Sequence, residues 1–285
     1  MYKLGIDIGI NNIGLGIYDT KTKQLIKKKY ISYKKSSAIM KKTLRSINTK
    51  NYLKFLIKKI DSFLGNTKIE YIGVACPGKV NTEKNIFFGS KELHVTKINF
   101  NKVLKKYNCP VYIENDCNCV ALGEALSNKY DKFLMITIGT ELGFSLVRKT
   151  RNKISLANDE KLKTVIELNK IPNTKNKRCI ESFKYLSELY NKRQNETLPR
   201  EAIFEDLRHN KDIIEKYITN FSKGINLINK KVKIKNICIG GSFSLHKRHY
   251  LQKMKNNLPK NEIFIAKNYN DAGIIGAINL PIKRY

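Results

Sequence analysis

Short apolar runs that end in turn residues dominate the first part of the chain. They are rich in Ile, Leu, Val or Tyr and are bounded by Gly, Pro, Asn or Asp. Such runs predict β-strands. We expect strands at 3–9, 13–19, 24–32, 70–76 and 111–114. Between them, apolar residues recur every three or four positions from 51 to 64, which predicts a helix with one buried face, ended by Gly65.

The alternation of strands and helices starts again after a predicted helix at 116–126. A strand pair is expected at 132–139 and 143–148, and the polar stretch 149–178 is interpreted as a loop with an uncertain helix. The remaining pattern predicts helices near 179–190, 199–208 and 211–230, a strand at 236–240, and then helix, strand and helix, the last beginning at Asp271. This recurrence predicts two α/β lobes with mixed sheets of βββαβα type, divided as 1–114 and 115–270.

Composition is compatible with two packed lobes. The chain has 285 residues, of which 41% are apolar, and this excludes wholesale disorder. Lys and Arg number 55 against 24 Asp and Glu, a net charge of +31. Most of this excess is lysine in a chain also crowded with Asn and Ile, which indicates a bias of genome composition rather than a nucleic-acid surface. We therefore do not expect nucleic acid as the main partner.

Polar residues near the start interrupt the apolar stretch before it reaches the length of a signal peptide, and no run approaches the ~18 apolar residues of a membrane span. The six cysteines form no CxxC pair and no zinc-finger spacing. We expect a cytoplasmic protein with reduced thiols and no membrane partner.

Candidate chemistry gathers where predicted strands end, which is where open α/β sheets place their ligands. An acid opens the first turn, a Pro-Gly turn follows the fourth strand, Asn and Asp follow the fifth, and two glycine turns follow later strands. The residues are Asp7, Gly9 and Asn11; Pro77 and Gly78; Asn115 and Asp116; Gly139 and Thr140; Gly240 and Gly241. Each cluster alone is compatible with an ordinary turn, and an Asp at position 116 is also the usual N-cap of a helix.

Taken together and in order, these motifs resemble the ROK sugar kinases and repressors, within the actin-like, hexokinase-like ATPase superfamily. The similarity rests on six segments: Gly5-Ile-Asp7-Ile-Gly9, Pro77-Gly78-Lys-Val80-Asn81, Glu114-Asn115-Asp116-Cys-Asn118, Gly139-Thr140-Glu-Leu-Gly143, Gly240-Gly241-Ser-Phe-Ser244 and Asp271-Ala-Gly273-Ile-Ile-Gly276-Ala277. The resemblance implies two actin-like (ribonuclease H-like) lobes flanking a cleft. It also implies that the C-terminal helix, within 271–285, packs back on the first lobe.

The resemblance implies an ATP-dependent kinase that phosphorylates a hexose or N-acetylhexosamine, with Mg²⁺ and ATP as cofactors. Asp116 would be the general base that takes the proton of the sugar hydroxyl. Asp7 would hold Mg²⁺ indirectly, Pro77, Gly78 and Asn115 would contact the sugar, and the nucleotide and its phosphates would meet Asp7, Gly9, Asn11, Gly139, Thr140, Gly240 and Gly241. A homodimer is expected by the same analogy.

Several positions depart from the family pattern. The opening turn has Ile10 and Asn11 in place of Gly-Thr, and Glu141 places a carboxylate beside the expected phosphate site, where it would repel phosphate. These departures keep open an alternative: a catalytically impaired protein that binds sugar or nucleotide as a regulator. A DNA-binding regulator is disfavoured, because the first strand begins at residue 3 with no helix-turn-helix before it.

The segment that carries sugar and zinc ligands in the family is also altered here. No GEIGH sequence is found; residues 158–160 lie near its place, and Lys163 stands where its His would fall. The cysteine-rich zinc run is reduced to residues 178–181 with one cysteine, so we predict no structural zinc. Glu160 and Glu181 remain candidate sugar ligands, although Glu181 would serve equally well as a solvated helix residue.

Overall fold

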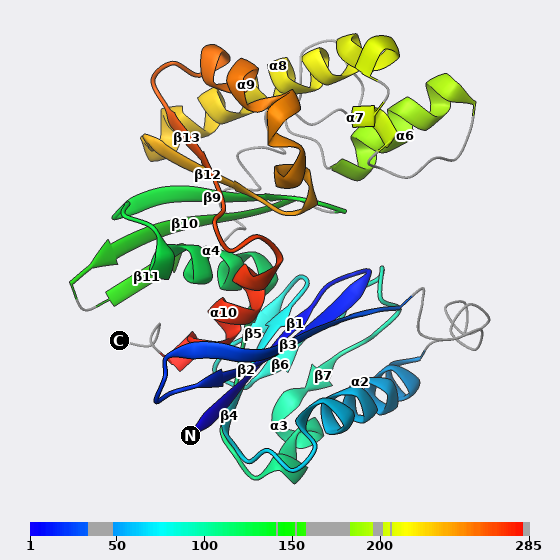
Figure 1. The fold of residues 1–285 in the computed structure, drawn as a ribbon, viewed down its shortest axis with the longest axis vertical. Helices are drawn as coiled ribbons and strands as arrows, with labels where there is room; N and C mark the ends of the chain where they lie inside the picture. Colours follow the sequence, from blue (N-terminus) through cyan, green and yellow to red (C-terminus); the bar gives the residue numbers. More distant parts are fainter. Residues whose placement is uncertain are drawn as a thin grey trace. The chain divides into compact units, whose positions relative to one another are not determined.

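The computed structural model describes residues 1–33, 48–140, 142–151, 153–157, 183–195, 202–205 and 207–281. The chain divides into two compact units, one made of Met1–Ser127, Asn152–Ile154 and Asn270–Tyr285, the other of Asn128–Arg151 and Ser155–Tyr269. Each unit is built around a mixed sheet, so the predicted α/β class is confirmed (Figure 1). Helix-forming and strand-forming segments alternate in both.

The sheet of the first unit has five strands in the order β3-β2-β1-β4-β8. β1, β2 and β3 are antiparallel neighbours, whereas β4 and β8 run parallel to β1. Their bounds are β1 Tyr2–Ile8, β2 Asn12–Asp19, β3 Gln24–Ser32, β4 Ile69–Cys76 and β8 Val111–Asn115, close to the predicted strands. The parallel strands therefore bring their carboxyl ends to one edge of the sheet.

Helix α2, Thr49–Leu64, covers one face of this sheet. Its apolar stripe, including Leu56 and Ile60, belongs to the same buried cluster as Leu4 and Ile6 of β1. Asn48 caps the helix start by accepting a hydrogen bond from the backbone N–H of Asn51, and Gly65 ends it with φ 55°. A positive φ favours glycine because it has no Cβ, so the cap predicted from the sequence is confirmed.

Helix α10, Ala272–Ile278, lies on the opposite face of the sheet (Figure 1). Side chains alternate along a strand, so Gly5 and Asp7 of β1 point toward α10 while Leu4 and Ile6 point toward α2. A Cβ on Gly5 would stand 2.7 Å from the backbone oxygen of Ile274. The sheet and α10 can approach this closely only because glycine occupies the contact.

Helix α4, Asp116–Ser127, also belongs to the first unit. The first lobe predicted from the sequence ends at residue 114, whereas the compact unit extends through Ser127. The physical reason is its contact with α10: a Cβ on Gly276 would stand 1.8 Å from the backbone oxygen of Cys119, and one on Gly123 would stand 2.3 Å from that of Ala272. The two helices pack backbone against backbone.

Between β4 and β8 the chain builds a small sheet that the apolar pattern did not predict. It contains β5, β6 and β7 in sequence order, each two residues long, followed by a short helix and a 3-10 turn. Strands of this length are too short to show a period of two. The elements are β5 Val80–Asn81, β6 Ile86–Phe87, β7 Ile98–Asn99, α3 Phe100–Val103 and η1 Lys105–Tyr107.

The sheet of the second unit has the order β11-β10-β9-β12-β13. Its strands are β9 Lys132–Ile138, β10 Leu142–Thr150, β11 Lys153–Ala157, β12 Asn236–Gly240 and β13 Glu262–Ile265. The interpretation of 149–178 as a loop with an uncertain helix is wrong for β11, whose alternating pattern is masked by charged neighbours. Residues 158–178 lie outside the described part of the chain.

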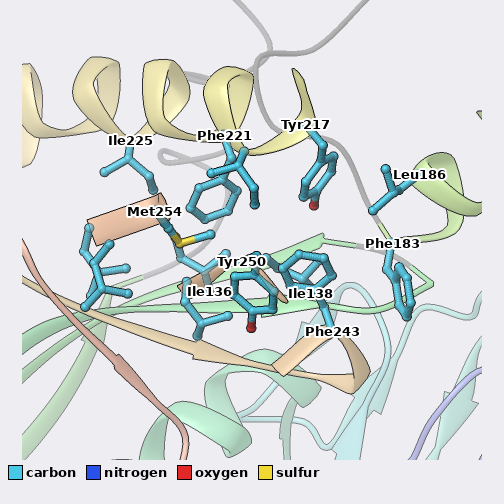
Figure 2. Close-up of a cluster of buried hydrophobic side chains, with 14 of the residues drawn as sticks. Ile136, Ile138, Phe183, Leu186, Tyr217, Phe221, Ile225, Phe243, Tyr250 and Met254 are labelled. Atoms are coloured by element: carbon cyan, nitrogen blue, oxygen red, sulfur yellow. The ribbon is translucent and has the colours of Figure 1, made fainter. Parts of the chain in front are cut away.

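Helix α8, Leu207–Val232, supplies much of the core of this second unit. Figure 2 shows Tyr217, Phe221 and Ile225 extending from α8 toward the sheet, where Ile136 and Ile138 of β9 are buried. The helix itself was predicted near 211–230 from its helical spacing. The other elements of this unit are α6 Phe183–Gln194, α7 Ala202–Glu205, η2 Ser242–His249 and α9 Leu251–Asn257. The short 3-10 turn η3, Tyr269–Asp271, leads into α10, and the first unit resumes at Asn270.

Candidate active site

Three strand ends of the first unit bring the predicted polar residues together. Asp7 of β1 pairs in register with Ala75 of β4, and Cys76 of β4 pairs with Asn115 of β8. The three strands are parallel, so Asp7, the Pro77-Gly78 turn and Asn115 share one edge of the sheet. Asp7 and Asn115 are far apart in the sequence. The strand order β1-β4-β8 places them at the same edge of the sheet.

Asn115 connects the Pro77-Gly78 turn to the start of α4 by hydrogen bonds. Its Nδ2 donates to the carbonyl oxygen of Gly78 at 3.0 Å and to Asp116 Oδ1 at 3.0 Å. Its Oδ1 accepts from the backbone N–H of Asn118 at 3.2 Å. Asn115 therefore caps α4, a role that the sequence left open for Asp116.

Asp116 occupies the first turn of α4 and is partly buried. Its Oδ1 also accepts a hydrogen bond from the backbone N–H of Cys117 at 2.8 Å. The two bonds to Oδ1 fix the orientation of the carboxylate. A carboxylate held in this way at a strand-to-helix junction can accept a proton from a hydroxyl group placed beside it.

Glu114 is a buried carboxylate next to this junction, and its sequence motif assigned it no separate role. Its Oε1 accepts from the backbone N–H of Asn115 at 2.9 Å and from Asn118 Nδ2 at 3.1 Å. It is only 3% exposed, so these bonds compensate for lost hydration. An acid at the end of an otherwise apolar strand was the available signal.

Asp7 is electrostatically coupled to Asp116. Burial, and secondarily the charge of Asp116, raise the pKa of Asp7 from its ordinary value of 3.8 to about 7. Two neighbouring carboxylates with restricted solvent repel each other, and either a proton or a bound cation relieves that repulsion. Asp7 and Asp116 are therefore the residues that would face a metal ion at this edge.

The opening turn between β1 and β2 is a closed hairpin. The backbone N–H of Gly9 donates to the carbonyl oxygen of Asn12 at 2.9 Å, and the carbonyl oxygen of Asn11 accepts from the backbone N–H of Tyr33 at 3.1 Å. A turn of this kind can receive phosphate through free N–H groups. Here the N–H of Gly9 is already engaged within the hairpin.

Within the second unit, two glycine turns lie at one edge of the sheet. Gly139 and Thr140 follow β9, Gly240 ends β12 and Gly241 follows it, and β12 pairs with β9 in parallel. Gly241 has φ 78°, and a Cβ there would stand 2.6 Å from the backbone oxygen of Ile138. Glycine is therefore required at this turn, and the two turns are neighbours in the structure.

The model of the family described as ROK family matches residues 3–155, more than half of the chain. The chain belongs to the ROK family. Within it, the xylose repressor of Bacillus subtilis is 23% identical over 149 residues, which are 51% of this chain and 37% of the repressor. This ROK chain thus matches little more than a third of the length of that relative.

Solved ROK structures share the fold over nearly the full chain. A ROK family protein from Streptococcus pneumoniae in complex with sucrose has a TM-score of 0.78 at 20% identity and covers 100% of both chains. A ROK glucokinase from Streptomyces griseus in complex with glucose and AMPPNP has a TM-score of 0.75 at 16% identity, covering 98% of this chain and 99% of that one. The predicted fold, two lobes with mixed α/β sheets as in ROK proteins, is confirmed.

Part of the predicted site of this ROK protein lies outside the described residues. Glu141, Glu160, Glu181 and the reduced cysteine run at 178–181 belong to that part. Among the residues that the structure does describe, no cluster of three or more His, Cys, Asp or Glu side chains could hold a metal ion. The absence of structural zinc stays a prediction, which metal analysis of the purified protein tests.

Gly273 of α10 and Asp271, the residue before this helix, belong to a motif in the sequence that assigned neither of them a role. A Cβ on Gly273 would stand 2.3 Å from Asp7 Oδ2, so this glycine forms the wall behind the carboxylate. Asp271 binds two side chains of β3.

The described helices include none long and apolar enough to cross a bilayer.

Proposed function

We propose that this ROK protein transfers the γ-phosphoryl group of ATP to a hydroxyl of a hexose or an N-acetylhexosamine. Asp116 is the observation on which the proposal rests: a carboxylate oriented by Cys117 and Asn115 at the edge where three parallel strands end. Bound sugar and a bound ATP analogue in the Streptomyces griseus relative support the same chemistry here.

In this mechanism the Asp116 carboxylate accepts the proton of the sugar hydroxyl as the hydroxyl oxygen bonds to the γ-phosphorus. The bond from that phosphorus to the bridging oxygen breaks, and ADP leaves with the electron pair. Asp116 then returns the proton to solvent. Positioning and neutralisation of charge supply most of the rate in such transfers.

The remaining candidates act on binding. Asn115, Pro77 and Gly78 would hold the sugar, joined by Glu160 and Glu181. Asp7 would hold Mg²⁺ of the MgATP substrate, which neutralises phosphate charge. Gly9, Asn11, Gly139 and Thr140 would border the phosphates, and Gly240 and Gly241 the nucleoside, because glycine lets the backbone approach closely.

A second candidate is a sugar- or nucleotide-binding regulator without turnover. The observation that favours it is the engaged N–H of Gly9, which donates to Asn12 rather than facing a ligand. The departures at Ile10 and Asn11 lie in the same turn. The similarity to the xylose repressor supports this regulatory function.

The deciding experiment measures ADP release from MgATP with purified protein against glucose, mannose, fructose, allose, N-acetylglucosamine and N-acetylmannosamine. We expect one or more sugars to stimulate release, and Asp116→Asn to lower kcat by ~10²–10⁴-fold while calorimetry shows sugar still binding. Asp19→Asn is the matched control, because Asp19 Oδ1 also accepts a backbone N–H, from Lys21 at 2.8 Å, at the other end of the sheet. Sugar binding with a flat ADP panel would support the regulator instead.

A further inference from the structure

Asp271, which immediately precedes α10, is held by two side chains of β3. Tyr30 donates its hydroxyl hydrogen to Asp271 Oδ1, and Lys28 Nζ donates to Oδ2 at 2.6 Å. The two segments that meet here are more than 240 positions apart in the sequence. We call Lys28, Tyr30 and Asp271 the β3–α10 clamp.

The clamp is attached to the helix that supports Asp7. Gly273, two residues after Asp271, lies against the Asp7 carboxylate, with its constructed Cβ 2.6 Å from Asp7 Cγ. The Tyr30 ring also reaches this face of the sheet, since a Cβ on Gly14 would stand 3.1 Å from its Cε1. A shift of the first turn of α10 would therefore change the space that the Asp7 carboxylate occupies.

The same turn contacts the helix that carries Asp116. The backbone oxygen of Ala272 lies 2.3 Å from a Cβ constructed on Gly123 of α4, so neither helix can move without displacing the other. The first turn of α10 thus lies between the supports of the two carboxylates. Packed backbones of this kind transmit displacements because they have no side chains to yield.

We propose that Tyr30 and Asp271 are positioning residues of the phosphoryl-transfer site: they hold the first turn of α10 so that the Asp7 carboxylate keeps its place beside Asp116. This inference rests on the proposed kinase function. Neither residue is required to touch substrate. Misplacement of a binding group by about 1 Å can cost ~10²-fold in rate, so a positioning effect is large enough to measure.

The competing explanation is that the clamp is an ordinary surface contact. The side chains of Lys28 and Asp271 are 53% and 25% exposed, and exposed ion pairs contribute little to stability. The first unit contains a matched group for comparison: Tyr107 donates to Asp61 Oδ1 at 2.9 Å, and Lys106 Nζ donates to Oδ2 at 2.5 Å. It has the same three residue types, joined to α2 and η1 rather than to α10.

The first experiment is a double-mutant cycle in urea unfolding with Tyr30→Phe and Asp7→Asn, in protein free of nucleotide and metal. We expect the effect of Tyr30→Phe on the unfolding equilibrium constant to change by at least about threefold when Asp7 is already Asn. Tyr107→Phe in the same cycle should show additive effects. Additivity in the Tyr30 cycle as well would overturn the inference, whether or not the protein is an enzyme.

The second experiment measures phosphorylation and calorimetric binding of MgADP. We expect Tyr30→Phe to lower kcat and raise the dissociation constant of MgADP by about tenfold, with the KM for sugar unchanged and Tyr107→Phe like the unsubstituted protein. Equal losses in both variants would overturn the positioning role. Coupling in the unfolding cycle together with an inactive unsubstituted protein would instead refute the kinase function and show that the clamp holds Asp7 for another purpose.

Discussion

Gly273 and Asp7 are in direct contact: a Cβ at position 273 would stand 2.3 Å from Asp7 Oδ2. No real Cβ approaches an oxygen so closely. The contact links the last helix of the chain to the end of its first strand, and it explains why the helix begins with small residues where it passes the carboxylate.

Gly273→Ala should displace the Asp7 carboxylate. We expect a loss of ~1–3 kcal/mol in the free energy of unfolding, typical of added volume in a packed site, and a marked loss of MgADP binding. Urea unfolding and calorimetry measure the two effects. In an Asp7→Ala background the same substitution should cost less, because the clashing atoms are gone; an undiminished cost would place the clash elsewhere.

The raised pKa of Asp7 predicts a pH dependence of stability in metal-free protein. The folded state keeps a proton on Asp7 up to about pH 7, whereas the unfolded chain releases it near 3.8. Between these values the folded state binds more protons, so the free energy of unfolding should fall as pH rises through this window. Asp7→Asn should flatten the profile, as judged by urea unfolding at several pH values in the presence of a chelator.

Asp61 provides a comparison of opposite sign. Its hydrogen bonds from Lys106 and Tyr107 lower its pKa despite the opposing effect of burial, so its contribution to stability is lost as pH falls. Asp61→Asn should therefore leave the decline between pH 4 and 7 in place. If it removed that decline, the assignment to Asp7 would be wrong.

Asn115→Ala should affect both stability and sugar binding. It removes the cap of α4 and the hydrogen bond to Gly78, which we expect to cost ~0.5–2 kcal/mol in unfolding free energy and to raise the KM for sugar. Asn48→Ala is a matched control, since Asn48 caps α2 by accepting from Asn51 N–H at 3.0 Å. A similar change of KM in both variants would show a general effect of stability.

Gly241→Ala should be more harmful than Gly65→Ala, although both positions have positive φ. Gly65 has nothing within 4 Å of a constructed Cβ, whereas at Gly241 that atom would meet the Ile138 oxygen at 2.6 Å. We expect about 1 kcal/mol for the strain at Gly65 and a clearly larger loss at Gly241. Urea unfolding of the two variants makes the comparison, and equal losses would mean that the turn at 241 relaxes freely.

Local patterns in the sequence were sufficient for most long elements. The spacing of Leu56, Ile60 and Phe63 predicted α2, and Gly65 predicted its end, because helical periodicity and positive φ are properties of neighbouring residues. The two-residue strands β5, β6 and β7 escaped prediction since they are too short to have a period. β11 escaped prediction for a different reason, because charged residues surround its apolar positions.

The sequence by itself determined which residues would be chemical candidates: Asp7, Gly78, Asn115 and Asp116 each lie at the end of an apolar strand or just after it. Only the tertiary structure decided their relationships. Asn115 and not Asp116 caps α4, and the charge of Asp116 raises the pKa of Asp7. Gly273 contacts the Asp7 carboxylate, and the Tyr30–Asp271 contact lies at the start of the same helix. The reason is physical: caps and periods depend on residues a few positions apart, whereas burial, charge coupling and close backbone contact depend on strand order and on segments more than 240 residues apart.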